Sequence, residues 1–359
     1  MNSLEQIEKK DTVPVRDGED FDRNALKTYL AEHITDFGNK ELEVEQFTTG
    51  FSNLTYFIRC GDWEAVMRRP PSGPLPPKAH DMKRESDLLT RLHPFFPFIP
   101  KPYVFCEDTE VLGVPFYVME RKQGVVLNDQ FPAGFNATDE LRVNISNEVV
   151  DALAQLHTID YNHADLSKFG KPSGFLERQV NGWIQRYLKY KTDDIPYFEK
   201  LSQWLVDHIP NSQYSSLIHN DYKLNNMLFL KNFTKIEAIL DWEMATVADP
   251  FFDLGGALGY WLEPDDPDYL KESLPTVTTE PGFITRNEFI HRYAIQTGYD
   301  IPPLGFYLAF TYFKLAVALQ QIYYRWKVGQ TNDSRFAEFK DRVSNLMLSA
   351  YEITETGKF

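Results

Sequence analysis

The chain has 359 residues, of which 43% are hydrophobic and 14% aromatic, a composition typical of a folded globular protein with room for two lobes or domains. A formal net charge of −15 argues against a nucleic-acid partner, and no apolar run approaches the roughly 18 residues that a membrane-spanning helix needs. Cys60 and Cys106 are the only cysteines, which excludes a disulfide framework and a cysteine zinc site and favours a cytoplasmic location.

The first part of the chain predicts a small sheet with flanking helices. Residues 1–20 are expected to form a loose tail, and Leu26 and Leu30 share one face of a helix that Asp22 is suited to cap. A proline-rich loop is expected at 70–77. The remaining elements are predicted as helices at 22–33 and 79–92 and strands at 41–48, 53–60, 63–69 and 111–119. Residues 21–119 are therefore expected to form a sheet lobe.

The second part of the chain predicts mainly helices. Residues 120–124 are polar and follow the last strand of the sheet lobe, so we expect an interlobe hinge there and a helical lobe over 125–359. Thr138 is suited to cap a strongly amphipathic helix. Helices are predicted at 138–157, 175–190, 197–208, 304–326 and 333–354. The predicted fold class is α+β, with a small antiparallel-sheet lobe and a larger, mainly helical lobe.

Two short apolar runs in the helical lobe predict a β-hairpin. The runs cover 227–230 and 236–240, and a polar turn lies between them. Antiparallel pairing about Phe233 places Asn226 opposite Leu240 and next to Asp241. Two oxygen ligands then meet at one end of the hairpin, which is the sparse oxygen site that Mg²⁺ prefers.

Asp221 lies on the loop that enters this hairpin. The pattern His219-x-Asp221-x-x-x-x-Asn226, followed by Asp241 at the end of an apolar strand, is the layout of an ATP-dependent phosphotransferase. In that layout Asp221 orients the acceptor hydroxyl and takes its proton, while Asn226 and Asp241 hold the metal. His219 is expected to brace the loop rather than act as a base. Lys223 is a candidate to steady the γ-phosphate, with an exposed lysine as the equal alternative.

At these residues the chain resembles the aminoglycoside phosphotransferase/choline kinase superfamily, a branch of the protein-kinase-like fold. The stretches 219–226, 241–245 and 249–255 carry the resemblance. The stretches 66–71 and 79–85 are similar to a subgroup that occurs alone or fused to acyl-CoA dehydrogenase domains. The resemblance implies a bilobal kinase-like fold, ATP and Mg²⁺ as cofactors, and a hydroxylated small molecule as acceptor. The association with acyl-CoA dehydrogenases favours a hydroxylated small molecule, with a hydroxyacyl thioester as one candidate.

Nucleotide contacts are predicted on the sheet lobe and at the hinge. The turn at 48–53 lies where a phosphate-covering loop is expected, although without the resemblance an ordinary hairpin turn is as good a reading. The backbone around 119–121 is expected to contact adenine. The candidate contacts are Gly50, Ser52, Asn53, Glu120 and Arg121.

Arg68 stands where kinases of this fold carry a strand lysine that holds the phosphates. Guanidinium stays charged and binds phosphate in a bidentate manner, so the electrostatic role is preserved. Glu85 on the following helix is the candidate partner of Arg68. The alternatives are a solvated strand end for Arg68 and an exposed helix charge for Glu85.

Three functions remain open at this level. The first is a small-molecule O-phosphotransferase, the second an aminoglycoside-modifying kinase, and the third a non-catalytic nucleotide-binding pseudokinase. The acidic loop at 263–268 either attracts a polyamine acceptor or is simply solvated. Asp249 and Asp253 are expected to be structural. A protein kinase is disfavoured because the chain has no H-R-D, D-F-G or A-P-E signature.

Overall fold

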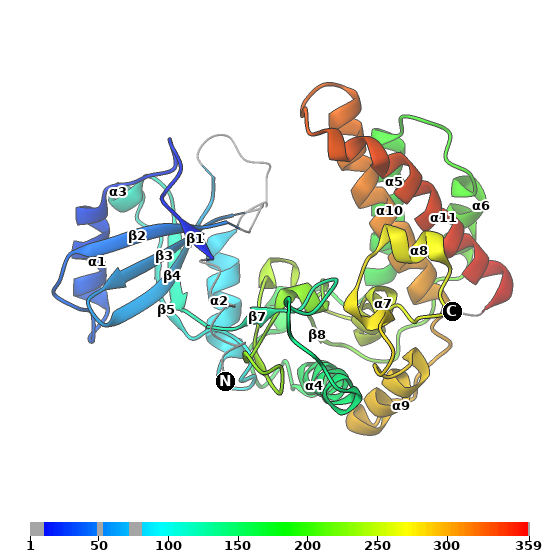
Figure 1. Ribbon diagram of the computed structural model, residues 1–359, viewed down its shortest axis with the longest axis horizontal. Coiled ribbons are helices and arrows are strands. Elements are labelled where there is room, and N and C mark those ends of the chain that lie inside the picture. The colour runs from blue at the N-terminus through cyan, green and yellow to red at the C-terminus, as the bar shows by residue number, and fades with distance from the viewer. Residues whose placement is uncertain (1–10, 49–52, 72–80, 358–359) are drawn as a thin grey trace.

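The chain folds into a sheet lobe and a helical lobe that meet near residue 120 (Figure 1). The computed structural model describes residues 11–48, 53–71 and 81–357. The α+β, bilobal class predicted from the sequence is confirmed. The proline-rich loop predicted at 70–77 lies largely outside the described residues.

The sheet lobe is built on a six-stranded antiparallel sheet with strand order β1-β2-β3-β4-β6-β5. Gly61 has a φ of +68°, a left-handed conformation that glycine adopts without strain, and it reverses the chain so that Cys60 pairs with Trp63. The strands are β1 (Thr12–Val13), β2 (Leu42–Phe47), β3 (Leu54–Cys60), β4 (Trp63–Arg69), β5 (Pro102–Cys106) and β6 (Phe116–Glu120). The helices are α1 (Arg23–His33), α2 (Met82–Leu92) and α3 (Thr109–Leu112).

Three predictions for the sheet lobe need correction. The loose tail expected at 1–20 is wrong in its described part, because Thr12 and Val13 form β1 and pair with β2. The strand expected at 111–119 is wrong at its start, because Asp108 accepts a hydrogen bond from the Glu110 N–H at 2.9 Å and begins α3, which ends at Gly113 with a φ of +78°. Strand β5 was not predicted. The helix expected from residue 79 begins instead at Met82 within the described residues, after the cap Asp81.

The helical lobe contains the remaining elements. Thr138 caps α4 as predicted, since its side chain accepts from the Leu141 N–H at 3.2 Å. Helix predictions at 175–190, 197–208 and 304–326 are confirmed to within a few residues, and the one at 333–354 becomes a 3₁₀ turn (Ser334–Glu338) followed by α11. The helices are α4 (Asp139–Thr158), α5 (Phe175–Tyr190), α6 (Phe198–Asp207), α7 (Pro250–Tyr260), α8 (Asp268–Ser273), α9 (Arg286–Thr297), α10 (Gly305–Lys327) and α11 (Phe339–Thr356). The short strands are β7 (Val125–Val126), β8 (Ser216–Ile218), β9 (Met227–Phe229), β10 (Ile236–Ile239) and β11 (Thr246–Ala248).

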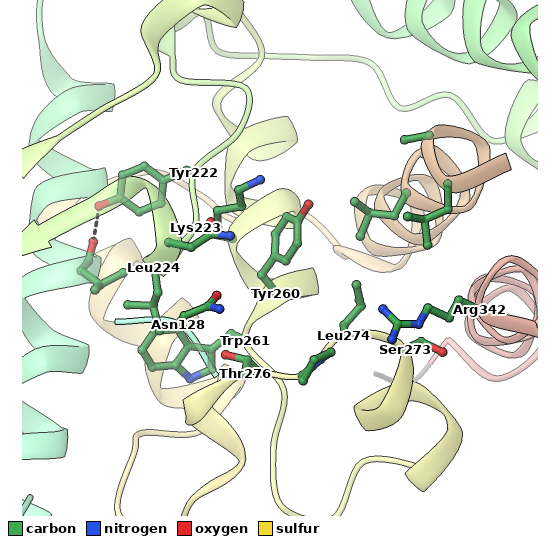
Figure 2. A pocket seen from close by; sticks show the side chains of 17 residues that line it. Asn128, Tyr222, Lys223, Leu224, Tyr260, Trp261, Ser273, Leu274, Thr276 and Arg342 are labelled. Carbon is green, nitrogen blue, oxygen red and sulfur yellow. Dashed lines mark hydrogen bonds between the residues drawn. The ribbon is translucent and has the colours of Figure 1, made fainter. Parts of the chain in front are cut away.

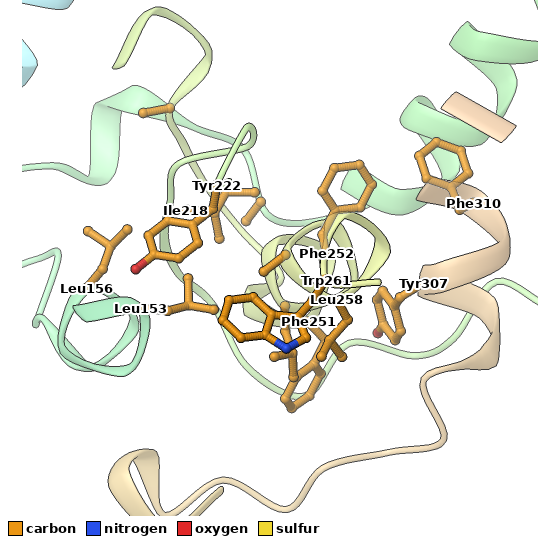
Figure 3. Close-up of a cluster of buried hydrophobic side chains, with 14 of the residues drawn as sticks. Leu153, Leu156, Ile218, Tyr222, Phe251, Phe252, Leu258, Trp261, Tyr307 and Phe310 are labelled. Atoms are coloured by element: carbon orange, nitrogen blue, oxygen red, sulfur yellow. The ribbon is translucent and has the colours of Figure 1, made fainter. Parts of the chain in front are cut away.

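The core of the helical lobe lies between α4, α7 and α10, with β8 running through it. Figure 3 shows Leu153 of α4 and Ile218 of β8 near Trp261, which follows α7. Gly255 and Gly259 allow α7 to approach α10 closely, because a Cβ on Gly255 would lie 2.5 Å from the Cβ of Tyr307. This packing fixes the positions of β8 and α10 on either side of residues 219–226. In the part of the chain that the structure describes, no helix is long and apolar enough to cross a membrane.

Candidate active site

The β9–β10 hairpin has the predicted register at its open end. Ile239 pairs with Met227, and the Leu240 N–H donates to the Asn226 carbonyl oxygen at 2.8 Å. Phe233 in the turn has a φ of +58° and is fully buried. The pairing predicted about Phe233 is thus confirmed at the open end, where it brings Asn226 next to Asp241, but nearer the turn the register shifts between Ile236 and Ala238, so that Ile236 pairs with Phe229.

The loop over residues 219–226, here called the Asp221 loop, is held to this hairpin by Asn226. The Asn226 side-chain amide donates to Asp221 Oδ2 at 3.0 Å and to the Asp221 carbonyl oxygen at 2.9 Å. Lys223 Nζ lies 2.9 Å from Asp221 Oδ2. Burial acts to raise the pKa of Asp221, but the charge of Lys223 and its hydrogen bond, with the charge of Lys314, lower this pKa below its ordinary value. Asp221 is therefore a carboxylate at neutral pH.

His219 holds the Asp221 loop in place through hydrogen bonds of its ring. Its ring is fully buried, with Nε2 2.9 Å from the Leu240 carbonyl oxygen, and Nδ1 accepts from the Asp221 N–H at 3.3 Å. Asp253 on α7 accepts from the backbone N–H groups of His219 at 2.6 Å and Asn220 at 2.7 Å. Asn220 has a φ of +69°, so the loop turns sharply just before Asp221. These hydrogen bonds fix the backbone before Asp221 and at Asp221, and so they orient its side chain.

Asp241 has the geometry of an oxygen ligand on an open surface. Its φ of +67° turns the backbone at the end of β10, and its side chain is 42% exposed. Within the described ranges no three His, Cys, Asp or Glu side chains gather as a metal site. Asn226 and Asp241 alone would leave most coordination positions of a metal to phosphate and water oxygens, which fits Mg²⁺.

Arg68 on β4 faces the hairpin from the sheet lobe. Its guanidinium forms an ion pair with Glu85 of α2 and lies 3.9 Å from Asp241 Oδ1. Side-chain exposure is 12% for Arg68 and 3% for Glu85, so the solvated strand end and the exposed helix charge are both wrong. Burial raises the pKa of Glu85, and the charge of Arg68 opposes that rise. Tyr117 of β6 adds a contact of 3.5 Å from its hydroxyl to Arg68 Nη1.

The other predicted nucleotide contacts are placed unevenly. Gly50 and Ser52 lie outside the described residues. Asn53 is buried and donates from its side-chain amide to Glu243 Oε2 at 3.3 Å, which joins the two lobes. The side chains of Glu120 and Arg121 both contact the sheet lobe. Glu120 Oε2 accepts from the Lys101 N–H at 3.0 Å. Arg121 Nη2 lies 3.2 Å from Asp11 Oδ1.

Two cations at the site were not predicted. Lys314 of α10 donates to the Asn220 carbonyl oxygen at 3.1 Å and to its side-chain oxygen at 3.2 Å. Burial lowers the pKa of Lys314, and Asp221 opposes this effect. Lys314 is the single charged residue in the apolar stretch 305–322, and that isolation was a signal in the sequence. The other cation, Arg84, had no such signal.

Arg84 of α2 fastens the sheet lobe to the helical lobe. Its guanidinium donates to the carbonyl oxygens of Ala245 at 2.6 Å, Phe169 at 3.0 Å and Glu243 at 3.3 Å. We expect Arg84→Met to lower the free energy of unfolding by about 1–3 kcal/mol, because three carbonyl groups lose a charged donor. Urea denaturation measures this loss. The control Lys83→Met removes an exposed neighbour on the same helix, and an equal loss in both variants would contradict the role of Arg84.

A cavity of about 370 Å³ opens beside the Asp221 loop (Figure 2). It reaches from Lys223 to Arg342 of α11 and is called here the Lys223–Arg342 cavity. Its walls come from the Asp221 loop, the end of α7, the segment after α8, and helices α10 and α11. The lining residues are Asn128, Val149, Tyr222, Lys223, Leu224, Asn225, Ala257, Tyr260, Trp261, Ser273, Leu274, Pro275, Thr276, Leu315, Ala318, Leu319 and Arg342.

Comparison with known proteins places this site in context. The family described as "Phosphotransferase enzyme family" matches residues 43–274. The chain is 34% identical to mouse (Mus musculus) acyl-CoA dehydrogenase family member 10 over 327 residues, covering 90% of this chain and 30% of the relative. It is 31% identical to human (Homo sapiens) acyl-CoA dehydrogenase family member 11 over 342 residues, covering 93% of this chain and 43% of the relative. The chain thus spans less than half the length of either relative.

A solved structure shares the whole architecture. It comes from Ralstonia eutropha and is provisionally named an aminoglycoside phosphotransferase. It superposes with a TM-score of 0.80 at 28% sequence identity, covering 95% of this chain and 100% of that chain. The two-lobed arrangement around the site is therefore shared with a protein of known structure.

Proposed function

Because the chain belongs to the phosphotransferase enzyme family, we propose that it is a small-molecule kinase that uses ATP and Mg²⁺. It transfers the γ-phosphate to a hydroxyl of a hydroxyacyl group or another hydroxylated metabolite. The observation that carries this proposal is the Asp221 carboxylate, bonded to Asn226 and Lys223 at the end of the hairpin where Asp241 faces Arg68. A carboxylate, two oxygen ligands and a phosphate-binding cation are what phosphoryl transfer asks of a protein.

The proposed reaction begins at Asp221. Its carboxylate accepts a hydrogen bond from the acceptor hydroxyl and takes the proton as the oxygen attacks the γ-phosphorus. The new O–P bond forms while the bond between the γ-phosphorus and the bridging oxygen of ADP breaks, so ADP leaves. The low pKa of Asp221 suits this role, because little proton transfer is needed before the P–O bond breaks.

The remaining side chains position the reacting groups and neutralise the charge of the phosphates. Arg68, held by Glu85, has its guanidinium 3.9 Å from Asp241 Oδ1, so it would bind phosphate oxygens beside the metal ligand. Asn226 and Asp241 would hold Mg²⁺, which neutralises phosphate charge when bound. Lys223 lies at the boundary between Asp221 and the Lys223–Arg342 cavity, so it is suited to steady the phosphate during transfer.

An acceptor panel tests this function. ADP release is measured with Mg²⁺ and ATP across hydroxyalkanoates, hydroxyacyl thioesters, sugars, amino alcohols and aminoglycosides. We expect one class to stimulate turnover in the wild type and not in Asp241→Asn, with Asp207→Asn on the exposed face of α6 as the matched control. Stimulation by aminoglycosides would instead support an antibiotic-modifying kinase. If Mg²⁺ and ATP raise the melting temperature but no acceptor supports turnover, the result would support a nucleotide-binding pseudokinase.

The pH dependence of turnover tests the pairing of Asp221 with Lys223. Asp221 must be ionised to take a proton, so kcat/KM holds above its pKa and falls as the pH drops through that pKa. Because this pKa is depressed below 3.8, the acid limb lies at low pH in the wild type. We expect Lys223→Met to move the acid limb to higher pH, because the nearest cation is removed while burial remains. Lys189→Met, on the exposed face of α5, should leave the limb in place.

A further inference from the structure

The walls of the Lys223–Arg342 cavity carry charge of one sign. In the portion of the chain described by the structure, its charged lining residues are Lys223 and Arg342, both cations, and its lining includes no carboxylate. Most of the remaining wall is aliphatic or aromatic. A polycationic acceptor would find no carboxylate among the described residues of this wall to bind it, although the net charge of the chain is −15.

The acidic loop at 263–268 does not compensate for this. Arg286 of α9 binds Asp266 through Nη1 at 2.9 Å and Nη2 at 2.5 Å, and the Arg286 N–H donates to Glu263 Oε1 at 2.6 Å. Two of its carboxylates are thus committed to an internal arginine that is 3% exposed. Neither of them lines the cavity, so the loop offers no binding site for a polyamine there.

The two cations of the cavity differ in their partners. Lys223 is paired with Asp221 at 2.9 Å. Arg342 is half-buried, and its guanidinium carbon lies 5.6 Å from the ring centroid of Phe339 on the same helix. No carboxylate of the described residues forms an ion pair with Arg342. A half-buried guanidinium that faces a cavity without an acidic partner is suited to bind a planar or tetrahedral oxyanion.

The distribution of polarity along the cavity gives the acceptor a direction. Figure 2 shows Lys223 and Arg342 on opposite sides, with Tyr260 and Leu274 between them. Leu315 and Leu319 of α10 are among the apolar residues that line the cavity. The acceptor hydroxyl has to lie at the Lys223 end, because Asp221 is there.

We propose that the acceptor is an amphiphile with a hydroxyl at the Asp221 end, an aliphatic middle, and an oxyanion, carboxylate or phosphate ester, bound by Arg342. This inference rests on the proposed function and names the substrate class of the same site. Arg342 is then the residue that determines acceptor specificity. The same charge disfavours cationic amino alcohols and aminoglycosides.

Direct binding tests this inference separately from turnover. Isothermal titration calorimetry is run on the full chain without nucleotide. The probes are short- and medium-chain hydroxyalkanoates, hydroxyalkyl phosphates and amino alcohols of matched length. We expect the acids to bind at least about tenfold more tightly than the amino alcohols. Arg342→Gln should weaken binding of the acids about ten- to a hundredfold, because it removes a charged hydrogen-bond donor, and it should not weaken binding of the amino alcohols, because it removes a like charge.

Two further variants keep the test decisive. Arg342→Lys keeps the charge and should retain part of the affinity, whereas Arg335→Gln removes an arginine that is 84% exposed and outside the cavity lining, and should change nothing. A preference for carboxylates over phosphates, or the reverse, identifies the oxyanion. Acids that bind no better than amino alcohols, or that bind equally to Arg342→Gln, would overturn the inference. Arg342-dependent binding without any ATP turnover would support the oxyanion site at Arg342 and contradict the proposed function.

Discussion

Replacing Asp221 with asparagine is expected to lower kcat by about 10²- to 10⁴-fold while nucleotide binding is retained. Asparagine has nearly the same shape and can still accept hydrogen bonds from Asn226 and Lys223 through its side-chain oxygen. It carries no charge and does not take the proton of the acceptor hydroxyl. The loss therefore falls on the chemical step rather than on folding or on ATP binding.

The measurement pairs steady-state kinetics with a nucleotide-binding assay. Asp207→Asn, at the exposed end of α6, is the matched control and should keep the wild-type kcat. Loss of ATP binding in Asp221→Asn would show that the carboxylate organises the nucleotide site instead. An unchanged kcat would remove Asp221 from the chemistry altogether.

Asp253→Asn is expected to lower the free energy of unfolding by about 2–4 kcal/mol. Asp253 is 2% exposed, and its two carboxylate oxygens each accept from a different backbone N–H, those of His219 and Asn220. Its Oδ2 also lies 3.3 Å from His157 Nε2. Asparagine offers one oxygen and one NH₂ group, so one backbone donor would face another donor in a buried place.

Chemical denaturation measures this loss, with Asp207→Asn again as the control. Activity should fall further than the unfolded fraction explains, because the same two N–H groups orient the Asp221 loop. A loss below about 0.5 kcal/mol would mean that the loop finds other partners for its two N–H groups and that the hydrogen bonds to Asp253 contribute little to stability.

The catalytic hairpin is the part of the site that the sequence predicted best. Its two strands are adjacent in the chain, and a short polar turn joins them, so pairing the two apolar runs about Phe233 was enough to predict the register at the open end. The position of Asn226 beside Asp241 followed from that register alone. The caps Asp22 and Thr138 were predictable for the same reason, because a cap bonds only to the next turn of its own helix.

The contacts of Arg68 and Glu85 were only half predictable. Their spacing on a strand and the following helix suggested a pair, but an amphipathic helix leaves the depth of a given polar residue open. Burial of Glu85 to 3% exposure depends on how α2 packs between the sheet and the helical lobe. That packing is a property of the whole lobe and not of the local pattern.

The sequence by itself determined the fold class, the hairpin that brings Asn226 next to Asp241, the place of Asp221 on the loop before it, and the resemblance to a phosphotransferase. These features depend on local periodicity and motif spacing. Only the tertiary structure decided that Arg84 bridges the lobes, that Lys314 holds the turn before Asp221, and that Arg342 faces the cavity. The physical reason is distance along the chain. Helix α10 reaches the Asp221 loop because glycines in α7 let it pack closely, and no local pattern predicts which residue of a distant helix lies at the site.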